Sequence, residues 1–175
     1  MANTYKLIAK SILSSGTSNV SFSSIPATYT DLHLLITART NYAVDNQDPI
    51  KITINGNSSA YYDAAIYDYQ AGSMYATVNT TNAHFLSFSS QTQNNPSNYF
   101  ALIDIYFPNY SSTSYGKVAQ SYFATNNTNL SNVFILGSQA FYHNTTSAIS
   151  TISLTPQNGT NFVTNSSFYL YGIGA

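Results

Sequence analysis

The sequence predicts an all-β protein, a sandwich or barrel of antiparallel strands, in a single domain over residues 1–175. Apolar side chains recur at every second position in many short segments, which is the period of a half-buried strand. Gly, Pro and Asn bound these segments, and the prolines fall at their edges or in loops. Tyr and Phe, which favour strands, number 16 and 10. Around eight to eleven short strands are expected from this pattern.

The first clear strand covers residues 30–39, where apolar and polar positions alternate. Leu32, Leu34 and Ile36 fall on one face, so this face is expected to enter the core. The opposite face is expected to carry His33, Leu35, Thr37 and Arg39.

A second clear strand, residues 50–54, repeats the alternation and ends at Asn55-Gly56. Asn-Gly readily adopts the positive φ angles of a type I′ turn, so this pair predicts a β-hairpin. The segment 59–70 that follows has two interpretations. Its tyrosines fall at helical spacing and fit a short helix, and they also fit a strand with a bulge.

The strand expected at 100–107 differs because apolar side chains occupy both of its faces. Leu102, Asp104 and Tyr106 share one face, and the odd-numbered positions 103–107 share the other. Strands that are buried on both sides read in this way, so a central strand covered on both faces is expected. Further strands are expected at 133–136, 149–154 and 168–171, and long loops at 41–48, 77–82, 89–98 and 111–115.

Charged residues are scarce: five are basic, six are acidic, and the formal net charge is -1. The basic residues are scattered, so the chain has no electrostatic footprint for nucleic acid. No apolar run reaches the roughly 18 residues that span a bilayer, and the N-terminus lacks the pattern of a signal peptide. Without cysteine there are neither disulfides nor thiolate metal ligands. We expect no nucleic-acid partner, no membrane partner and no cofactor.

The histidines and acids form no catalytic or metal-binding motif. His33, His84 and His143 lack the spacing of metal ligands, and a surface or interface role is expected for His33. Asp45 and Asp48 bracket a loop with oxygen ligands that Ca²⁺ could accept. That loop lacks the EF-hand spacing, so a solvated loop is the favoured interpretation.

Asp104 is the unusual acid because it lies within the most apolar strand. A structural hydrogen bond to Arg39 or to a tyrosine hydroxyl is expected to hold it. A nucleophile elbow of the G-x-S-x-G kind and a Gly-rich phosphate loop are both absent from the sequence. The protein is therefore expected not to be an enzyme.

Four tyrosines cluster in the segment 59–70, together with two aspartates. Tyrosine offers a large, rigid contact area with a polar tip, so such a cluster is typical of recognition surfaces for sugars or proteins. The alternative is that inward-facing tyrosines belong to the core and outward-facing ones line a subunit interface. The candidate contact residues are Tyr61, Tyr62, Tyr67 and Tyr69.

Two parts of the chain carry a resemblance to a known family. The segments are residues 11–15 and 20–32 near the start, and 149–156 and 170–173 at the end. They resemble the small surface proteins of tailed-bacteriophage virions. The resemblance implies a jelly-roll-like antiparallel β-sandwich on the outside of a phage particle, as a capsid decoration, head fibre or tail fibre, or tail-associated subunit. It also implies a homotrimer, made in the host cytoplasm.

Two functions follow from these observations. The first is a virion structural protein that acts through contacts with itself and with other virion proteins. Its scarcity of charge predicts contacts that are insensitive to salt. The alternative is a carbohydrate-binding module that recognises glycans on the host surface.

Overall fold

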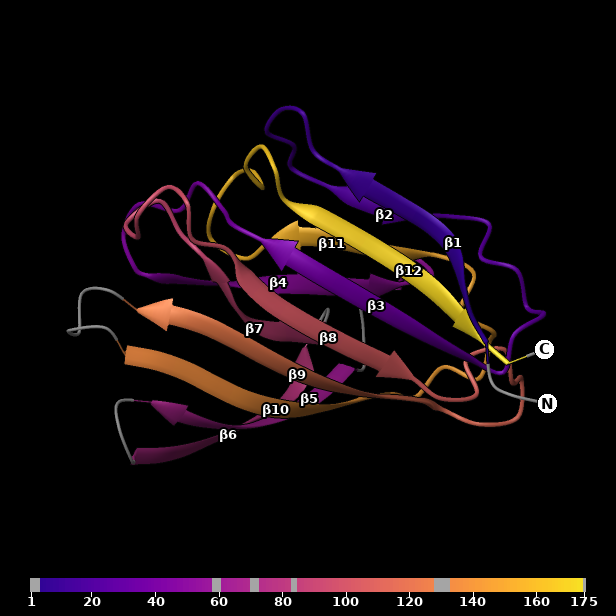
Figure 1. Ribbon diagram of the computed structural model, residues 1–175. Helices are drawn as coiled ribbons and strands as arrows, with labels where there is room; N and C mark the ends of the chain where they lie inside the picture. Colours follow the sequence, from indigo (N-terminus) through magenta and orange to yellow (C-terminus); the bar gives the residue numbers. More distant parts are fainter. Residues whose placement is uncertain (1–3, 58–60, 70–72, 83–84, 128–132, 175) are drawn as a thin grey trace.

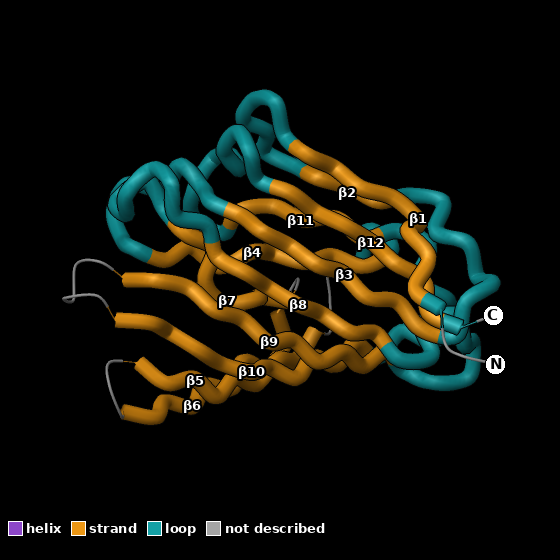
Figure 2. The backbone as a smooth tube through the Cα atoms, viewed as in Figure 1, coloured by secondary structure: helices purple, strands orange, loops and turns teal. Residues whose placement is uncertain are grey.

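The residues that the structure describes form twelve antiparallel strands and contain no helix (Figures 1 and 2). This computed structural model describes residues 4–57, 61–69, 73–82, 85–127 and 133–174. The all-β prediction is confirmed. In chain order the strands are β1 (Tyr5–Ile12), β2 (Val20–Phe22), β3 (Asp31–Ala38), β4 (Gln47–Ile54), β5 (Tyr61–Tyr69), β6 (Ser73–Asn82), β7 (Phe85–Gln91), β8 (Ala101–Phe107), β9 (Lys117–Asn127), β10 (Val133–His143), β11 (Ile152–Pro156) and β12 (Ser167–Ile173).

The strands form two sheets that pack face to face as a β-sandwich. The larger sheet has eight strands in the order β1-β12-β3-β8-β9-β10-β5-β6. The smaller sheet has four, in the order β2-β11-β4-β7. Figure 1 shows the smaller sheet behind the β1–β8 half of the larger one.

A jelly roll is visible once two hairpins, β5–β6 and β9–β10, are set aside. The remaining strands pair from the outside inwards: β1 with β12, β2 with β11, β3 with β8, and β4 with β7. This nested pairing is the jelly-roll arrangement of two sheets. The jelly-roll-like prediction is therefore confirmed by the strand order.

The two hairpins make the sheets unequal. The β5–β6 hairpin lies in the connection between β4 and β7, and the β9–β10 hairpin in the connection between β8 and β11. β9 pairs with β8, and β5 pairs with β10, so both hairpins extend the same edge of the same sheet. This is why one sheet has eight strands and the other four.

The core lies between the sheets and follows from the alternation in the sequence. Leu32, Leu34 and Ile36 of β3 are fully buried, as their shared face predicts. They face fully buried isoleucines of the smaller sheet within one hydrophobic cluster. The buried isoleucines of that sheet are Ile50, Ile52, Ile54 and Ile152.

The turn at Asn55-Gly56 is confirmed, but the hairpin is not. Both residues have positive φ, 53° and 67°, and the Asn57 N–H donates to the Ile54 carbonyl at 2.9 Å. β4 and β5 belong to different sheets, so the turn redirects the chain across the sandwich. The Asn55 side chain fixes the crossing because its oxygen accepts the Thr151 N–H at 3.0 Å.

Three local expectations are also resolved. Within the segment 59–70, the described residues Tyr61–Tyr69 form a strand with a bulge, since β5 pairs with β6 through a register shift between Tyr61 and Asp63. The loop expected at 77–82 is wrong, because these residues belong to β6. Arg39 is not on the outer face of β3: its guanidinium is buried and donates to the carbonyls of Asn95 and Pro96 in a loop.

Candidate functional site

The outer side of the eight-stranded sheet is the most unusual surface of the described molecule. β8 is buried on one side only, so the expectation that both of its faces are covered is wrong within a single chain. Leu102 is 46% exposed, and Asp104 and Tyr106 beside it also reach solvent. The outer sides of the neighbouring strands carry exposed apolar side chains too. We call this surface the aromatic face, defined by Tyr5, Leu7, Leu102, Tyr106, Val118, Tyr122, Leu136 and Tyr142.

Strand register assembles this face from distant parts of the chain. One row of paired residues crosses the whole sheet at right angles to the strands, and side chains within such a row are neighbours. Along the row the side chains become smaller from β8 to β5, and the side chain on β6 is larger than that on β5. In sheet order the row is Leu7, Tyr171, His33, Tyr106, Gln120, Ala140, Ala64 and Val78.

The end of the row near β1 is an aromatic cluster. The Tyr5 ring meets the His33 ring edge-on, with centroids 5.4 Å apart, and the Tyr171 ring at 6.2 Å. His33 Nε2 lies 2.6 Å from Asp104 Oδ1. His33 is thus on the outer side, opposite Leu32, as expected. The predicted partner of Asp104 is wrong, since His33 holds this carboxylate rather than Arg39 or a tyrosine.

Asp31 is the second acid on this side of the sheet, and it is also engaged. It accepts the Tyr106 hydroxyl at 2.6 Å and the Asn109 N–H at 2.8 Å. The hydrogen bond to Asp31, with some burial, raises the pKa of Tyr106 to about 12. Asp31 and Asp104 are therefore both hydrogen-bonded on this side of the sheet.

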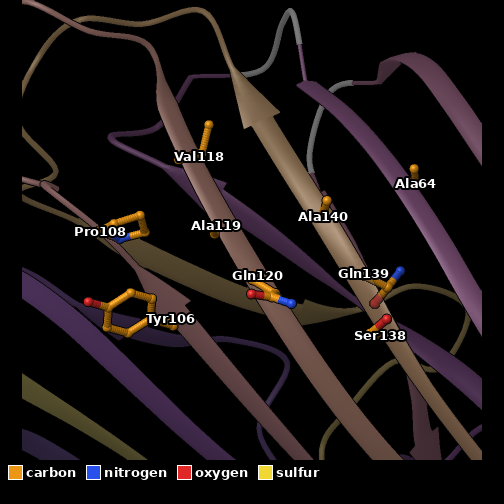
Figure 3. Close-up of a pocket in the computed structure, with 9 residues that line it drawn as sticks. All are labelled: Ala64, Tyr106, Pro108, Val118, Ala119, Gln120, Ser138, Gln139 and Ala140. Carbon is orange, nitrogen blue, oxygen red and sulfur yellow. The ribbon is translucent and has the colours of Figure 1, made fainter.

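A hollow of about 480 Å³ lies beyond Tyr106 on the same face (Figure 3). It forms because β10 and β5 present Ser138, Ala140 and Ala64 next to the larger side chains of β8 and β9. The lining is uncharged, and its polar groups are amides and hydroxyls. We call it the central hollow, lined by Ala64, Tyr106, Pro108, Val118, Ala119, Gln120, Ser138, Gln139 and Ala140.

Tyr122 stands on the face beside the central hollow. It pairs across the strands with Asp104 on one side and Ser138 on the other. It is 57% exposed, and its hydroxyl accepts a hydrogen bond from Gln120 Nε2 at 2.8 Å. A second hollow of about 430 Å³, which Tyr122 and Leu136 help to line, lies on its other side. Tyr122 is therefore a raised ring with a hollow on each side.

Tyr61, the first of the predicted contact residues, is a core residue. It is fully buried. Its hydroxyl accepts a hydrogen bond from the Ile54 N–H at 2.8 Å and donates one to the Asn57 carbonyl at 2.9 Å. Its ring packs edge-on against the His143 ring, with centroids 4.0 Å apart, and burial raises its pKa. This is the inward placement of the alternative interpretation, and it removes Tyr61 from any recognition surface.

The other three predicted tyrosines are not brought into one described patch. Tyr62 is half-buried on the outer side of β5, where its ring centroid lies 5.8 Å from that of Tyr142. Tyr67 and Tyr69 pair with Gly137 and Ile135 of β10, and their side chains lie outside the described residues.

The residues that sequence reasoning missed are Tyr106, Gln120, Tyr122 and Leu136. One signal was present: the apolar side chains on both faces of β8. β9 was missed because its alternation is inverted, with Val118, Gln120 and Tyr122 outside and Ala119 and Ser121 inside. A strand is usually recognised by large apolar side chains on the face that enters the core. On β9 several of the large side chains lie on the outer face, so this pattern is missing.

The outer side of the four-stranded sheet has the opposite character. On β2, β11 and the end of β4 the described outward side chains are short and hydroxylated, and Ser21 Oγ lies 3.1 Å from Ser153 Oγ. Lys51 on β4 adds a charge. We call this surface the hydroxyl face, defined by Ser21, Thr53, Ser153 and Thr155.

The remaining candidate ligands have structural partners. Asp48 is buried and accepts the backbone N–H groups of Asn158 and Gly159 at 2.8 and 2.9 Å, so the solvated loop is wrong for this residue. His143 is buried, and His84 lies outside the described residues. Among the residues with a described placement, no three His or Asp side chains gather into a possible metal site. No helix in that part of the chain could cross a membrane.

Comparison with known proteins adds little to this geometry. No protein-family model and no curated protein matches the sequence. Among solved structures, the chain is similar to the CBM2 module of the evolved Dit of Lactobacillus casei BL23 phage J-1. The identity is 9%, the TM-score is 0.28, and the match covers 90% of this chain and 69% of that one. A TM-score of this size carries no inference about this chain.

Proposed function

We propose that the protein is a structural subunit of a bacteriophage particle that assembles with copies of itself through the aromatic face, and that it is not an enzyme. The observation that carries this proposal is the contrast between the two outer surfaces. One sheet has an outer side of hydroxyls, whereas the other exposes tyrosine, leucine and valine side chains over strands from several parts of the chain. A face of this kind marks an interaction site.

The size of the aromatic face supports a stable contact. A tyrosine buries about 150–250 Å², so its four tyrosines, each roughly half exposed, present on the order of 400 Å². The leucines and Val118 add to this area. The total exceeds the few hundred Å² usual for a monomer and approaches the roughly 800 Å² per partner of a standard interface.

The scarcity of charged side chains on the face supports a second copy as the partner. Two copies of one surface repel each other when that surface has a net charge. Here Asp104 is paired with His33, and Asp31 is hydrogen-bonded to Tyr106 and Asn109. Placement on a phage particle is supported by the resemblance of residues 11–15, 20–32, 149–156 and 170–173 to virion surface proteins. The homotrimer and the other virion partners stay predictions.

The test is the molar mass in solution, measured by light scattering and sedimentation over a range of concentrations. Wild-type protein is expected to be a multimer, and Leu136→Asp, at a side chain that is 55% exposed, is expected to give a folded monomer. Thr53→Asp, the same change on the hydroxyl face, should leave the multimer intact. A monomeric wild type, or equal loss in both variants, would contradict the proposal.

Placement on the particle needs a separate experiment. Gold-labelled antibody is expected to mark phage particles by electron microscopy, on heads for a decoration or head fibre and on tails for a tail-associated subunit. Particles that carry no label would remove the virion assignment and leave a self-associating binding module.

Carbohydrate binding is the second candidate, favoured by the paired rings of Tyr62 and Tyr142 on the same face. Exposed aromatic rings stack on sugars, and Gln120 beside them offers an amide for sugar hydroxyls. A panel of neutral host-wall oligosaccharides, titrated against wild type and Tyr142→Ala, tests this function. Binding that Tyr142→Ala reduces at least tenfold would favour it, and no binding by wild type would exclude it for those sugars.

A further inference from the structure

Resting on the proposed function, we propose a specific contact within the assembly: the Tyr122 ring of one copy is seated in the central hollow of a second copy. The hollow then receives a protein side chain rather than a free ligand. The contact joins β9 of one subunit to β8, β9, β10 and β5 of another.

Shape complementarity on the described face is the first argument. Tyr122 is the most exposed aromatic side chain on the central strands of the sheet, and it stands beside the central hollow rather than in it. In a symmetric interface, a side chain that lies off the symmetry axis contacts a different residue of the partner copy. The floor of the hollow consists of Ala64, Ser138 and Ala140, which are small enough to admit a ring (Figure 3).

The chemistry of the lining is the second argument. Its apolar part, with Val118, Pro108 and the alanines, suits the body of a tyrosine ring. Its polar groups, Gln120 and Ser138, are neutral and suit a phenolic hydroxyl. A charged side chain would lose its hydration there without gaining a partner, because no charged residue lines the central hollow.

The third argument is that the contact repeats the packing inside the molecule. The two sheets of one chain already pack by interdigitating the side chains of their inner faces. Stacking one aromatic face on another adds a layer of the same kind, at the spacing of about 10 Å usual for stacked sheets. Tyrosine is also among the residues that most often dominate the binding energy at such interfaces.

The contact is tested by removing the Tyr122 ring, by filling the central hollow with a new ring, and by combining the two changes. Tyr122→Ala should raise the dissociation constant of the assembly about 30-fold or more, as expected for a central contact. Ala140→Phe should raise it by a similar factor, because the phenyl ring fills the hollow that the incoming tyrosine needs. The double variant should recover most of the affinity, since the new ring takes the space that the tyrosine leaves.

Two control variants match these changes. Tyr115→Ala removes a tyrosine that is 71% exposed but lies outside the aromatic face, and Ser153→Phe adds a ring to the hydroxyl face. Both should assemble like wild type, and urea unfolding of every variant should confirm that it folds.

The outcomes separate this contact from the proposed function. A wild type that assembles, together with Tyr122→Ala and Ala140→Phe variants of unchanged affinity, would overturn the contact and leave the proposed function standing. Additive losses in the double variant would also overturn it, because the two side chains would then not meet. A wild type that stays monomeric would overturn both.

Discussion

On both sheets of this sandwich, successive side chains point alternately into the core and outwards. The two outer surfaces differ in the polarity of the outward side chains. On the hydroxyl face, β2, β4 and β11 alternate buried isoleucine, leucine, valine or phenylalanine with outward side chains that are partly or fully exposed, namely serine and threonine together with Lys51 of β4. On the aromatic face, β8 and β9 place tyrosine, leucine and valine outside, and β9 places Ser121 and Thr125 inside. The first pattern places polar side chains in water and needs no partner. The second leaves apolar side chains in water, where a partner subunit would cover them.

The contrast between the two faces shows where the chain places the hydrophobic residues that do not enter its core. With so few charged residues, the chain keeps its surface wet through hydroxyls and amides. It does so on one side of the sandwich and not on the other. Apolar side chains on both faces of β8 were expected to be covered on both sides, and a second copy is the cover that we propose.

The largest effect on the free energy of unfolding is expected from a substitution on the inner side of β5, compared with one on its outer side. Tyr61→Ala should lower the free energy of unfolding by about 3–5 kcal/mol, because it leaves a core cavity and removes the partner of the Ile54 N–H. Tyr62→Ala, one residue along on the outer side, should cost the isolated chain less than about 1 kcal/mol. Urea unfolding of the two variants measures both values, and similar losses would mean that β5 is buried on both sides.

Giving the aromatic face the composition of the hydroxyl face is expected to dissolve the assembly. The triple variant Leu102→Thr, Val118→Thr and Leu136→Thr removes three apolar side chains that would each contribute about 1–2 kcal/mol on burial. The dissociation constant should rise on the order of 100-fold or more, and the circular dichroism of the fold should not change. A triple change of Thr53, Ser153 and Thr155 to alanine is the matched control, and an equal effect there would erase the distinction between the faces.

A smaller effect is expected from alkaline titration, because the aromatic face carries a tyrosine with a raised pKa. Tyr106 stays protonated in the folded state up to a pKa of about 12, compared with 10.0 for an ordinary tyrosine. Between these values the unfolded chain binds fewer protons, so the free energy of unfolding falls as the pH rises. Tyr106→Phe should make this fall shallower in urea unfolding across the range, and an unchanged slope would contradict the hydrogen bond to Asp31.

Buried Lys117 acts with the opposite sign in the same experiment. Its ammonium group donates to the carbonyls of Ser112, Tyr115 and Thr146, and desolvation lowers its pKa. Stability therefore rises as the pH passes upwards through the window below 10.5. Comparing Tyr106→Phe with wild type cancels this contribution, since both proteins retain Lys117.

The smallest effect is expected from salt. The acids described on this side of the sheet are Asp31 and Asp104, and both are hydrogen-bonded, so few charges exist for ions to screen. The dissociation constant should change less than about threefold between low salt and about 1 M salt. Sedimentation at the two ionic strengths checks this, and a steep weakening with salt would mean that charged groups carry the contact.

The sequence was a good guide wherever one face of a strand is apolar and the other is polar. β3 and β4 were predicted on this basis, and their apolar positions are buried in the structure. The strand expected at 149–154 overlaps β11 at residues 152–154 only. For β5, one of the two open interpretations, the strand with a bulge, is confirmed. The Asn55-Gly56 turn was predicted from backbone chemistry alone, but its context was wrong because a local signal does not tell which sheet receives the next strand.

The candidate site could be predicted only in part. The register that joins β8, β9, β10 and β5 brings together Tyr106, Gln120, Ala140 and Ala64, and no spacing along the chain indicates that contact. The tyrosines at 61–69 were conspicuous by their number, yet Tyr61 is in the core. The residues that matter on the face are single tyrosines and small alanines, which composition does not distinguish.

The two inserted hairpins have a consequence for how this protein can change over generations. Half of the residues that define the aromatic face, including Tyr122 and Leu136, and most of the lining of the central hollow belong to β5, β9 and β10, which in the jelly roll are connections. Connections tolerate substitution and insertion better than the framework that they join. A new partner could thus be acquired by altering two hairpins, while the nested strand pairs that define the fold are inherited unchanged.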